Sequence, residues 1–94
     1  MHSYEVVFIV HPDLDENSLK GVVDRVQSWI TDAGGTVTKV DQWGKRRMAY
    51  PIRKQREGNY VLFNVSLETG TTAGLEQNLR YTETVMRHML TLVA

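Results

Sequence analysis

The sequence contains no cysteine and no long hydrophobic run. The absence of cysteine excludes a disulfide framework and thiolate chemistry. The longest apolar run, Val6 to Val10, is far shorter than the roughly 20 residues of a membrane-spanning helix. Residues 1–4 hold no basic region that leads into an apolar run, so we expect no signal peptide. These absences fit a reducing compartment and predict no membrane association.

The chain also lacks net charge, because 11 Lys and Arg residues balance 11 Asp and Glu residues. A general attraction to nucleic acid is therefore excluded, and any local attraction must come from an uneven distribution of charge. The 94 residues are 41% hydrophobic, which is enough for one core. No linker, repeat or low-complexity segment interrupts them. We expect a single domain over residues 1–94.

Four segments predict β-strands, and the first of them is rich in β-branched and aromatic residues. The third is the clearest, because its apolar residues alternate strictly and should place one face on the core. The strands are expected at residues 4–10, 36–52, 59–67 and 86–93, and the core-facing residues of the third are Val61, Phe63, Val65 and Leu67.

The second of these strands carries signs of irregularity. Val37 and Val40 lie at opposite parities, which predicts a bulge, and Gly44 predicts another. Pro51 cannot donate a ladder hydrogen bond, so this strand should lie at an edge of the sheet. We expect residues 53–58 to form the turn that follows.

Two segments have the spacing of amphipathic helices. The first lies between candidate capping residues at 13–18 and the Gly34-Gly35 pair. The second is shorter, follows candidate caps at residues 69–72, and places Leu75 and Leu79 one turn apart. The apolar stripe of the first helix consists of Leu19, Val22, Val23, Val26 and Ile30, with Trp29 beside it.

The expected order, strand-helix-strand-strand-helix-strand, is that of the α+β ferredoxin-like βαββαβ split fold. Because the two crossovers are right-handed, both helices should cover one face of a four-stranded antiparallel sheet, with the first and third strands central. The other face of the sheet is left bare. Val7, Ile9, Tyr60 and Leu62 are expected there, and exposed apolar surface of this kind suggests a partner.

No group of residues predicts catalysis or metal binding. His2, His11 and His88 have no spacing typical of a metal pair. The acidic residues at 13–16 are explained by the start of a helix, and they argue against phosphate binding at that turn. We therefore expect no catalytic residue, no metal, no cofactor and no small-molecule substrate.

An RNA-recognition motif shares this topology, but it stacks bases on aromatic residues of the third strand. In this chain Glu57 precedes Gly58 where that motif has a basic residue, and Asn59 follows where it has an aromatic residue. Phe63 belongs to the core-facing set. Base stacking of that type is therefore not expected.

Positive charge is concentrated in residues 45–56, which hold six of the eleven Lys and Arg residues and no acidic residue. Arginine outnumbers lysine there four to two, and its guanidinium makes forked contacts to phosphate. Met48, Tyr50 and Ile52 are interleaved with the charges and predict an anchored segment. A solvated hairpin end is the simpler interpretation, but an anchored basic hairpin suits binding of a phosphate backbone. The basic residues are Lys45, Arg46, Arg47, Arg53, Lys54 and Arg56.

Three motifs carry a resemblance to a known family. They are Tyr4-Glu5-Val6, the run Gly44-Lys45-Arg46-Arg47-Met48-Ala49-Tyr50-Pro51-Ile52, and Gly58-Asn59-Tyr60. With these motifs in this order, the chain resembles the bacterial small-subunit ribosomal protein six family over essentially its whole length. The resemblance implies a ferredoxin-like fold, no enzyme activity, and a structural role in the small ribosomal subunit, in the cytoplasm of a bacterium or in an organelle.

The resemblance further implies two partners, namely the central domain of small-subunit ribosomal RNA and small-subunit ribosomal protein eighteen, with which the chain would form a heterodimer. It assigns Arg46 and Arg47, with Tyr50 beside them, to the partner and RNA side, and Arg80 and Arg87 fall where the family also carries basic residues. The candidate RNA- or partner-binding residues are Lys45, Arg46, Arg47, Tyr50, Arg53, Lys54, Arg56, Arg80 and Arg87. A small homodimeric ferredoxin-like binding or regulatory module is the alternative.

Overall fold

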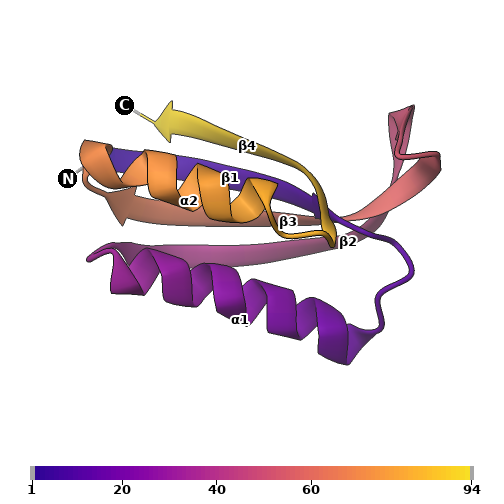
Figure 1. The fold of residues 1–94 in the computed structure, drawn as a ribbon, viewed down its shortest axis with the longest axis horizontal. Coiled ribbons are helices and arrows are strands. Elements are labelled where there is room, and N and C mark those ends of the chain that lie inside the picture. Colours follow the sequence, from indigo (N-terminus) through magenta and orange to yellow (C-terminus); the bar gives the residue numbers. More distant parts are fainter. Residues whose placement is uncertain (1, 94) are drawn as a thin grey trace.

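The computed structural model describes residues 2–93, and its elements follow the expected order (Figure 1). No helix in this range is long and apolar enough to cross a membrane. The elements are β1 (His2–Val10), α1 (Glu16–Asp32), β2 (Thr36–Ile52), β3 (Gln55–Leu67), a 3-10 turn (Thr69–Thr71), α2 (Thr72–Arg80) and β4 (Val85–Val93).

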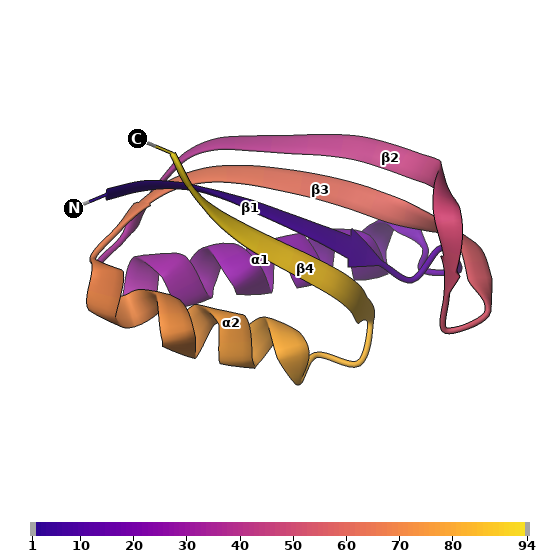
Figure 2. The same cartoon turned by 90° about the horizontal axis from the view of Figure 1, so that it is seen from above.

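The four strands form one antiparallel sheet in the order β2-β3-β1-β4. Figure 2 shows both helices on the same side of this sheet, so the predicted ferredoxin-like βαββαβ arrangement is confirmed. The first and third strands are central, as expected. The strand that contains Pro51 lies at an edge, where the missing backbone N–H breaks no ladder.

The core lies between the sheet and the helices. The rings of Phe8 and Phe63 meet at its centre, with centroids 5.5 Å apart and planes inclined at 60°. Both side chains are fully buried, and burial of each stabilises the fold by roughly 1.5–3 kcal/mol. The predicted core face of β3 is confirmed, because Val61, Phe63, Val65 and Leu67 are all buried together with Val22, Val23, Val26 and Ile30 of α1 and with Leu75 and Leu79 of α2.

Helix α1 begins and ends as its sequence predicts. The Oδ1 atom of Asp15 accepts a hydrogen bond from the backbone N–H of Ser18 at 2.7 Å, which satisfies a donor that the first turn leaves free. Hydrogen bonds from Ser18, chiefly that backbone bond, lower the pKa of Asp15 because they favour the ionised carboxylate. The chain leaves the helix through Gly34 at φ 85°, a conformation that glycine adopts without steric cost.

Both predicted irregularities of β2 are confirmed. The register of β2 against β3 shifts between Val37 and Lys39, and again between Gln42 and Gly44. Gly44 has φ 79°, so it supplies the left-handed conformation of the second bulge. One extra residue at each bulge turns the following side chains to the opposite face of the sheet.

The predicted turn at residues 53–58 is wrong in its length. Only Arg53 and Lys54 form the turn, since Ile52 pairs with Gln55, and β3 begins four residues earlier than expected. Arg53 and Lys54 have φ angles of 50° and 65°. Two successive left-handed residues give a hairpin turn whose twist matches that of the flanking strands. Ile52 and Gln55 therefore pair beside the turn, although the register of the two strands shifts once more between Arg47 and Ile52.

Candidate functional site

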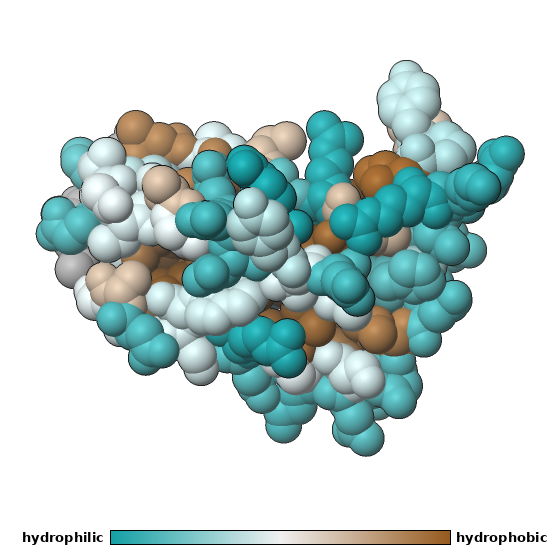
Figure 3. Space-filling model, in the orientation of Figure 1, coloured by the Kyte–Doolittle hydropathy of each residue, from teal (hydrophilic) through white to brown (hydrophobic). Residues whose placement is uncertain are grey.

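The main candidate site is the end of the β2–β3 hairpin, residues 45–56, which we call the basic hairpin. Pairing between β1 and β3 reaches only to Asn59, so the hairpin projects past the end of β1 (Figure 1). Figure 3 shows hydrophilic side chains gathered over this end of the molecule. All six of its basic residues, Lys45, Arg46, Arg47, Arg53, Lys54 and Arg56, are exposed.

Antiparallel pairing orders the first part of the basic hairpin. Lys45 lies opposite Asn59, Arg46 opposite Gly58 and Arg47 opposite Glu57. The Nε atom of Arg46 donates a hydrogen bond to the backbone carbonyl of Trp43 at 3.2 Å, which fixes part of its guanidinium. Because Arg47 pairs with Glu57, the acidic residue that follows Arg56 lies directly across the sheet from Arg47. Lys45 and Arg46 are the less opposed of these three cations.

An apolar cluster anchors the basic hairpin to the body of the sheet. Met48 is buried with Ile9 of β1 and Met86 of β4, and Ile52 and Tyr60 pack against them. The sequence-based expectation that Met48 and Ile52 anchor the segment is confirmed. The same expectation for Tyr50 is wrong, because its side chain is 78% exposed and its ring is available for contacts outside the chain.

The residues Gly58-Asn59 join this hairpin closely to β1. A Cβ atom at Gly58 would clash with the Cγ2 methyl of Ile9, so only glycine allows this approach of the two strands. Asn59 is buried, and its Nδ2 donates a hydrogen bond to the backbone carbonyl of His11 at 3.3 Å. These contacts give the third motif of the sequence a structural task at the base of the basic hairpin.

The structure brings Arg80 and Arg87 to the tip of the basic hairpin. Arg53 in the turn, Arg80 in the last turn of α2 and Arg87 on β4 line one hollow of about 260 Å³. The Nη1 atom of Arg53 donates a hydrogen bond to the backbone carbonyl of Glu83 at 2.7 Å, which ties the turn to the loop before β4. The other candidate cations, Lys45, Arg46, Arg47, Lys54 and Arg56, do not line this hollow.

The face of the sheet opposite the helices is apolar over part of its area, and we call it the open face. Val7 pairs with Leu62 and Met89, and Ile9 pairs with Tyr60 and Arg87, so these side chains share that face. The predicted set Val7, Ile9, Tyr60 and Leu62 is therefore confirmed. Val7, Ile9, Tyr60 and Met89 surround a hollow of about 240 Å³, and Met89 is 55% exposed.

Sequence reasoning missed an aromatic pair on the open face. The rings of Trp43 and Tyr60 are stacked, with centroids 6.1 Å apart and planes inclined at 11°. The indole Nε1 of Trp43 donates a hydrogen bond to Oδ2 of Asp41 at 3.2 Å. Trp43 occupies the bulge between Gln42 and Gly44, and only the register of that bulge decides which face it takes. The alternation of apolar residues along the sequence therefore could not have predicted that Trp43 stacks on Tyr60.

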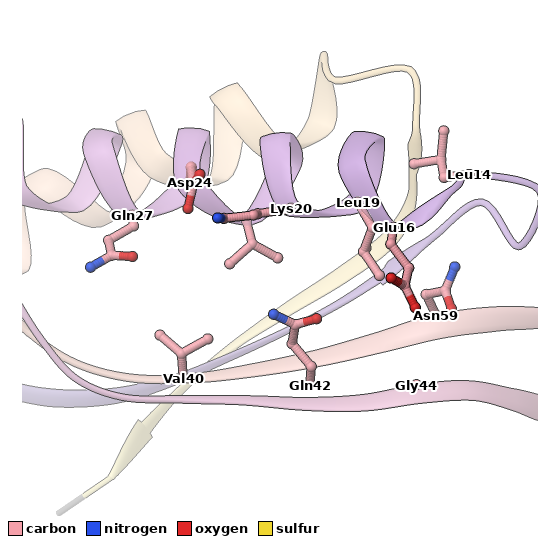
Figure 4. Close-up of a pocket in the computed structure, with 11 residues that line it drawn as sticks. Leu14, Glu16, Leu19, Lys20, Asp24, Gln27, Val40, Gln42, Gly44 and Asn59 are labelled. Atoms are coloured by element: carbon pink, nitrogen blue, oxygen red, sulfur yellow. The ribbon is translucent and has the colours of Figure 1, made fainter.

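Another hollow, of about 660 Å³, lies on the other side of the sheet between α1 and β2 (Figure 4). Glu16, Lys20 and Asp24 line it from the helix, and Val40 and Gln42 face them from the strand. This wall mixes both signs of charge with apolar groups. It has no counterpart among the candidate residues that the sequence suggested.

Among the histidines and acidic residues that were considered for chemistry and rejected, His11 and Asp15 have local structural roles. The Nδ1 atom of His11 accepts a hydrogen bond from the backbone N–H of Asp13 at 3.2 Å, and Asp15 caps α1. Within residues 2–93, no group of three His, Cys, Asp or Glu side chains could hold a metal ion. The arrangement at the basic hairpin and the open face is thus suited to binding, with exposed guanidinium groups beside exposed apolar and aromatic surface.

Comparison with known proteins places these features in a family. The family model described as Ribosomal protein S6 matches residues 3–91. The chain is 46% identical over 91 residues to the small ribosomal subunit protein bS6 of Moorella thermoacetica, a match that covers 97% of this chain and 93% of the relative. It is 47% identical over 90 residues to the bS6 protein of Clostridium botulinum strain 657, with 96% of each chain covered.

A solved structure gives the same assignment. The crystal structure of 30S ribosomal protein S6 from Thermotoga maritima matches with a TM-score of 0.94 and 29% sequence identity, over 98% of this chain and 87% of that one. The family match, the near full-length relatives and the shared fold agree with one another. The chain therefore belongs to the ribosomal protein S6 family, a family of small ribosomal subunit proteins.

Proposed function

We propose that this chain is a structural constituent of the small ribosomal subunit that binds the central domain of small-subunit ribosomal RNA together with small-subunit protein eighteen, as a heterodimer. It would be located in the ribosome, in the cytoplasm of a bacterium or in an organelle. One observation carries the proposal: exposed cations project on an anchored hairpin directly beside an unpartnered apolar face. Residues 1–94 act as one domain in this role.

The basic hairpin is the part that meets RNA. Lys45 and Arg46 extend along an exposed strand at a sheet edge, where a phosphate backbone can approach without displacing another strand. The guanidinium of Arg46 keeps free N–H donors besides the one that Trp43 holds, and forked donation to phosphate is the contact it makes best. Such contacts position RNA and do not read its sequence.

The open face is the part that meets the protein partner. Met89 and the stacked Trp43–Tyr60 pair leave apolar and aromatic area in contact with water, and covering such area is favourable. A protein partner on the open face would explain how a chain without net charge can bind RNA, since the partner would add phosphate contacts of its own. Two adjoining footprints then bind with a raised effective concentration.

The function involves binding without catalysis. The chain belongs to a family of ribosomal proteins, and His11 and Asp15 are engaged in a turn and a helix cap. Neither a cofactor nor a small-molecule substrate enters the proposed role.

The test is binding to an RNA fragment of the central domain in the presence of purified protein eighteen, measured by filter retention across a salt series. We expect Arg46→Ala/Arg47→Ala to weaken the ternary complex and to reduce the slope of log K against log salt by about 1.4–1.8, if each arginine neutralises one phosphate. Lys20→Ala/Arg25→Ala removes the same charge from the exposed face of α1 and should leave the slope unchanged.

Two outcomes would contradict the proposal. An equal effect of the two double variants would mean that only net charge matters. A homodimer in native mass spectrometry that ignores both RNA and protein eighteen would favour the homodimeric module, with Met89 and its neighbours on the open face as the surface between copies.

A further inference from the structure

The hollow at the tip of the basic hairpin gathers three arginines that are far apart in the sequence. Arg53 comes from the turn, Arg80 from the end of α2 and Arg87 from β4. Its floor is apolar, because Leu79, Val85 and Met86 beneath it are buried. None of the side chains that line the hollow is acidic. Three cations thus surround one apolar-floored depression.

In the part of the chain that the structure describes, the positive charges of Arg80 and Arg87 are not balanced by acidic side chains. Within residues 2–93, neither Arg80 nor Arg87 has an ion-pair partner. Like charges that share a site repel one another, and an apolar floor with low polarisability strengthens that repulsion. An anion in the hollow would remove the repulsion and would gain charge-assisted hydrogen bonds from more than one guanidinium.

Part of the site is already held in place. The hydrogen bond of 2.7 Å from Arg53 Nη1 to the carbonyl of Glu83 uses one of the five N–H donors of this guanidinium and orients the rest. Arg80 lies in the last turn of α2, where a cation is favoured by the helix dipole. Arg87 has no such structural task, and it also lines the adjoining hollows on the open face and beneath the hairpin.

The dimensions fit a phosphate group. The hollow of about 260 Å³ is several times the roughly 30 Å³ that one water occupies in the liquid, so it admits a phosphate and some of its waters. The hollow also continues the positive surface of the basic hairpin, because Arg53 belongs to both. A nucleic-acid strand that follows the hairpin would carry its next phosphates across the hollow.

We propose that Arg53, Arg80 and Arg87 form a phosphate-binding pocket that holds one phosphodiester of the bound RNA, separate from the contacts of Lys45 and Arg46. This inference rests on the proposed RNA-binding function and deepens it. The pocket connects the hairpin with the end of α2 and with β4, so the RNA contacts three elements of the fold at one point.

The first experiment uses the same ternary complex and salt series. Arg80→Gln/Arg87→Gln leaves Arg53 and its hydrogen bond intact, and should lower the salt slope by about 0.7–0.9, the value for one phosphate. The matched control is Lys20→Gln/Arg25→Gln on α1, with no expected change. If Arg80→Gln/Arg87→Gln changes nothing while Arg46→Ala/Arg47→Ala keeps its effect, the pocket is refuted and the proposed function stands. If neither pair changes the slope, both fall.

The second experiment needs no RNA and uses the wild-type chain. Inorganic phosphate is titrated while the Nε–Hε signals of the arginines are followed by NMR, with acetate at equal ionic strength as the carboxylate comparison. We expect the signals of Arg80 and Arg87 to move together with phosphate, and to move less with acetate, while that of Arg25 stays in place. Equal movement with both anions would point to a carboxylate of a protein partner and would overturn the assignment to phosphate, as would no movement.

Discussion

Gly58→Ala should destabilise the protein, although alanine usually favours the folded state when it replaces glycine in a compatible conformation. Gly58 is buried and lacks the left-handed φ that forbids a side chain, so its backbone conformation alone does not require glycine. The requirement comes from β1. A Cβ atom at residue 58 would clash with the Cγ2 methyl of Ile9, and it would lie 3.4 Å from Cε of Met86 and 3.5 Å from the carbonyl oxygen of Val10.

The magnitude follows from which of these neighbours can move. The thioether end of Met86 is flexible, and 3.5 Å from a carbonyl is ordinary contact. Ile9 is branched at Cβ and therefore stiff about χ1, and it is buried between Met48 and Met86. Overpacking of this kind costs about 1–3 kcal/mol, while the reduced freedom of the unfolded chain returns about 0.4–1 kcal/mol. We expect a net loss of about 1–2 kcal/mol.

The assay is urea denaturation, followed by tryptophan fluorescence, which reports on Trp29 packed against the core and on Trp43 stacked on Tyr60. For a domain of this size the loss should lower the urea midpoint by on the order of 1 M. The diagnostic step is a double-mutant cycle with Ile9→Leu, which keeps the side-chain volume but removes the branch at Cβ. In that background Gly58→Ala should cost less than about 0.5 kcal/mol, so the coupling energy should be about 0.5 kcal/mol or more.

Additivity would refute the reasoning. If Gly58→Ala costs the same with isoleucine or leucine at position 9, the contact with Ile9 is not the cause. A stabilising effect of Gly58→Ala in the wild-type background would show that the two strands separate easily at the base of the hairpin.

Two further predictions concern the core and the cap of α1. Phe63→Ala should lower the free energy of unfolding by about 3–5 kcal/mol in the same urea assay, because Phe63 is fully buried against Phe8. Leu62→Ala on the open face should cost well under half as much. The reverse order would mean that the two faces of β3 are exchanged. Because its folded-state pKa is depressed, Asp15 contributes stability that is present above its ordinary pKa and is lost as the pH falls through the folded value. Asp15→Asn, which keeps an acceptor for Ser18, should therefore reduce the loss of stability below about pH 4, and parallel pH profiles would contradict this.

The sequence predicts those parts of the fold that depend on local periodicity. Strict alternation in β3 assigned Phe63 to the core because neighbouring side chains of a strand point to opposite faces. The capping candidates at residues 13–18 and the Gly34-Gly35 pair marked the ends of α1, because capping involves only nearby backbone groups; the structure then identifies Asp15 as the N-cap. Pro51 assigned β2 to the edge through the donor that it lacks.

The turn of the basic hairpin was misjudged because its residues give no turn signal. Two-residue hairpins of this twist usually have asparagine, aspartate or glycine at the left-handed positions, but Arg53 and Lys54 occupy them here. The hydrogen bond from Arg53 to the carbonyl of Glu83 joins segments that are distant in the sequence, and it helps to hold this unfavourable conformation. Local propensity cannot include a contact of that range.

The candidate site was predictable as a set of residues but not as an arrangement. Positive charge between residues 45 and 56 is visible in the sequence, whereas its junction with Arg80 and Arg87 depends on how α2 and β4 return to the sheet. In the same way, the stack of Trp43 on Tyr60 depends on a bulge that one extra residue creates. The arginine grouping and the aromatic stack both depend on tertiary structure, which the periodicity of the sequence does not predict.

The two edges of the sheet differ in their openness to strand addition by another chain. The register of edge β2 shifts at three places, and near its end this strand carries cations and Pro51, all of which hinder pairing with a foreign strand. Edge β4 pairs regularly with β1 from Val93 to Arg87 and exposes Leu92 at 58%. Edge-to-edge association, including unwanted aggregation of the free protein, should therefore begin at β4. A partner that covers this edge in an assembled particle would also protect the chain from self-association.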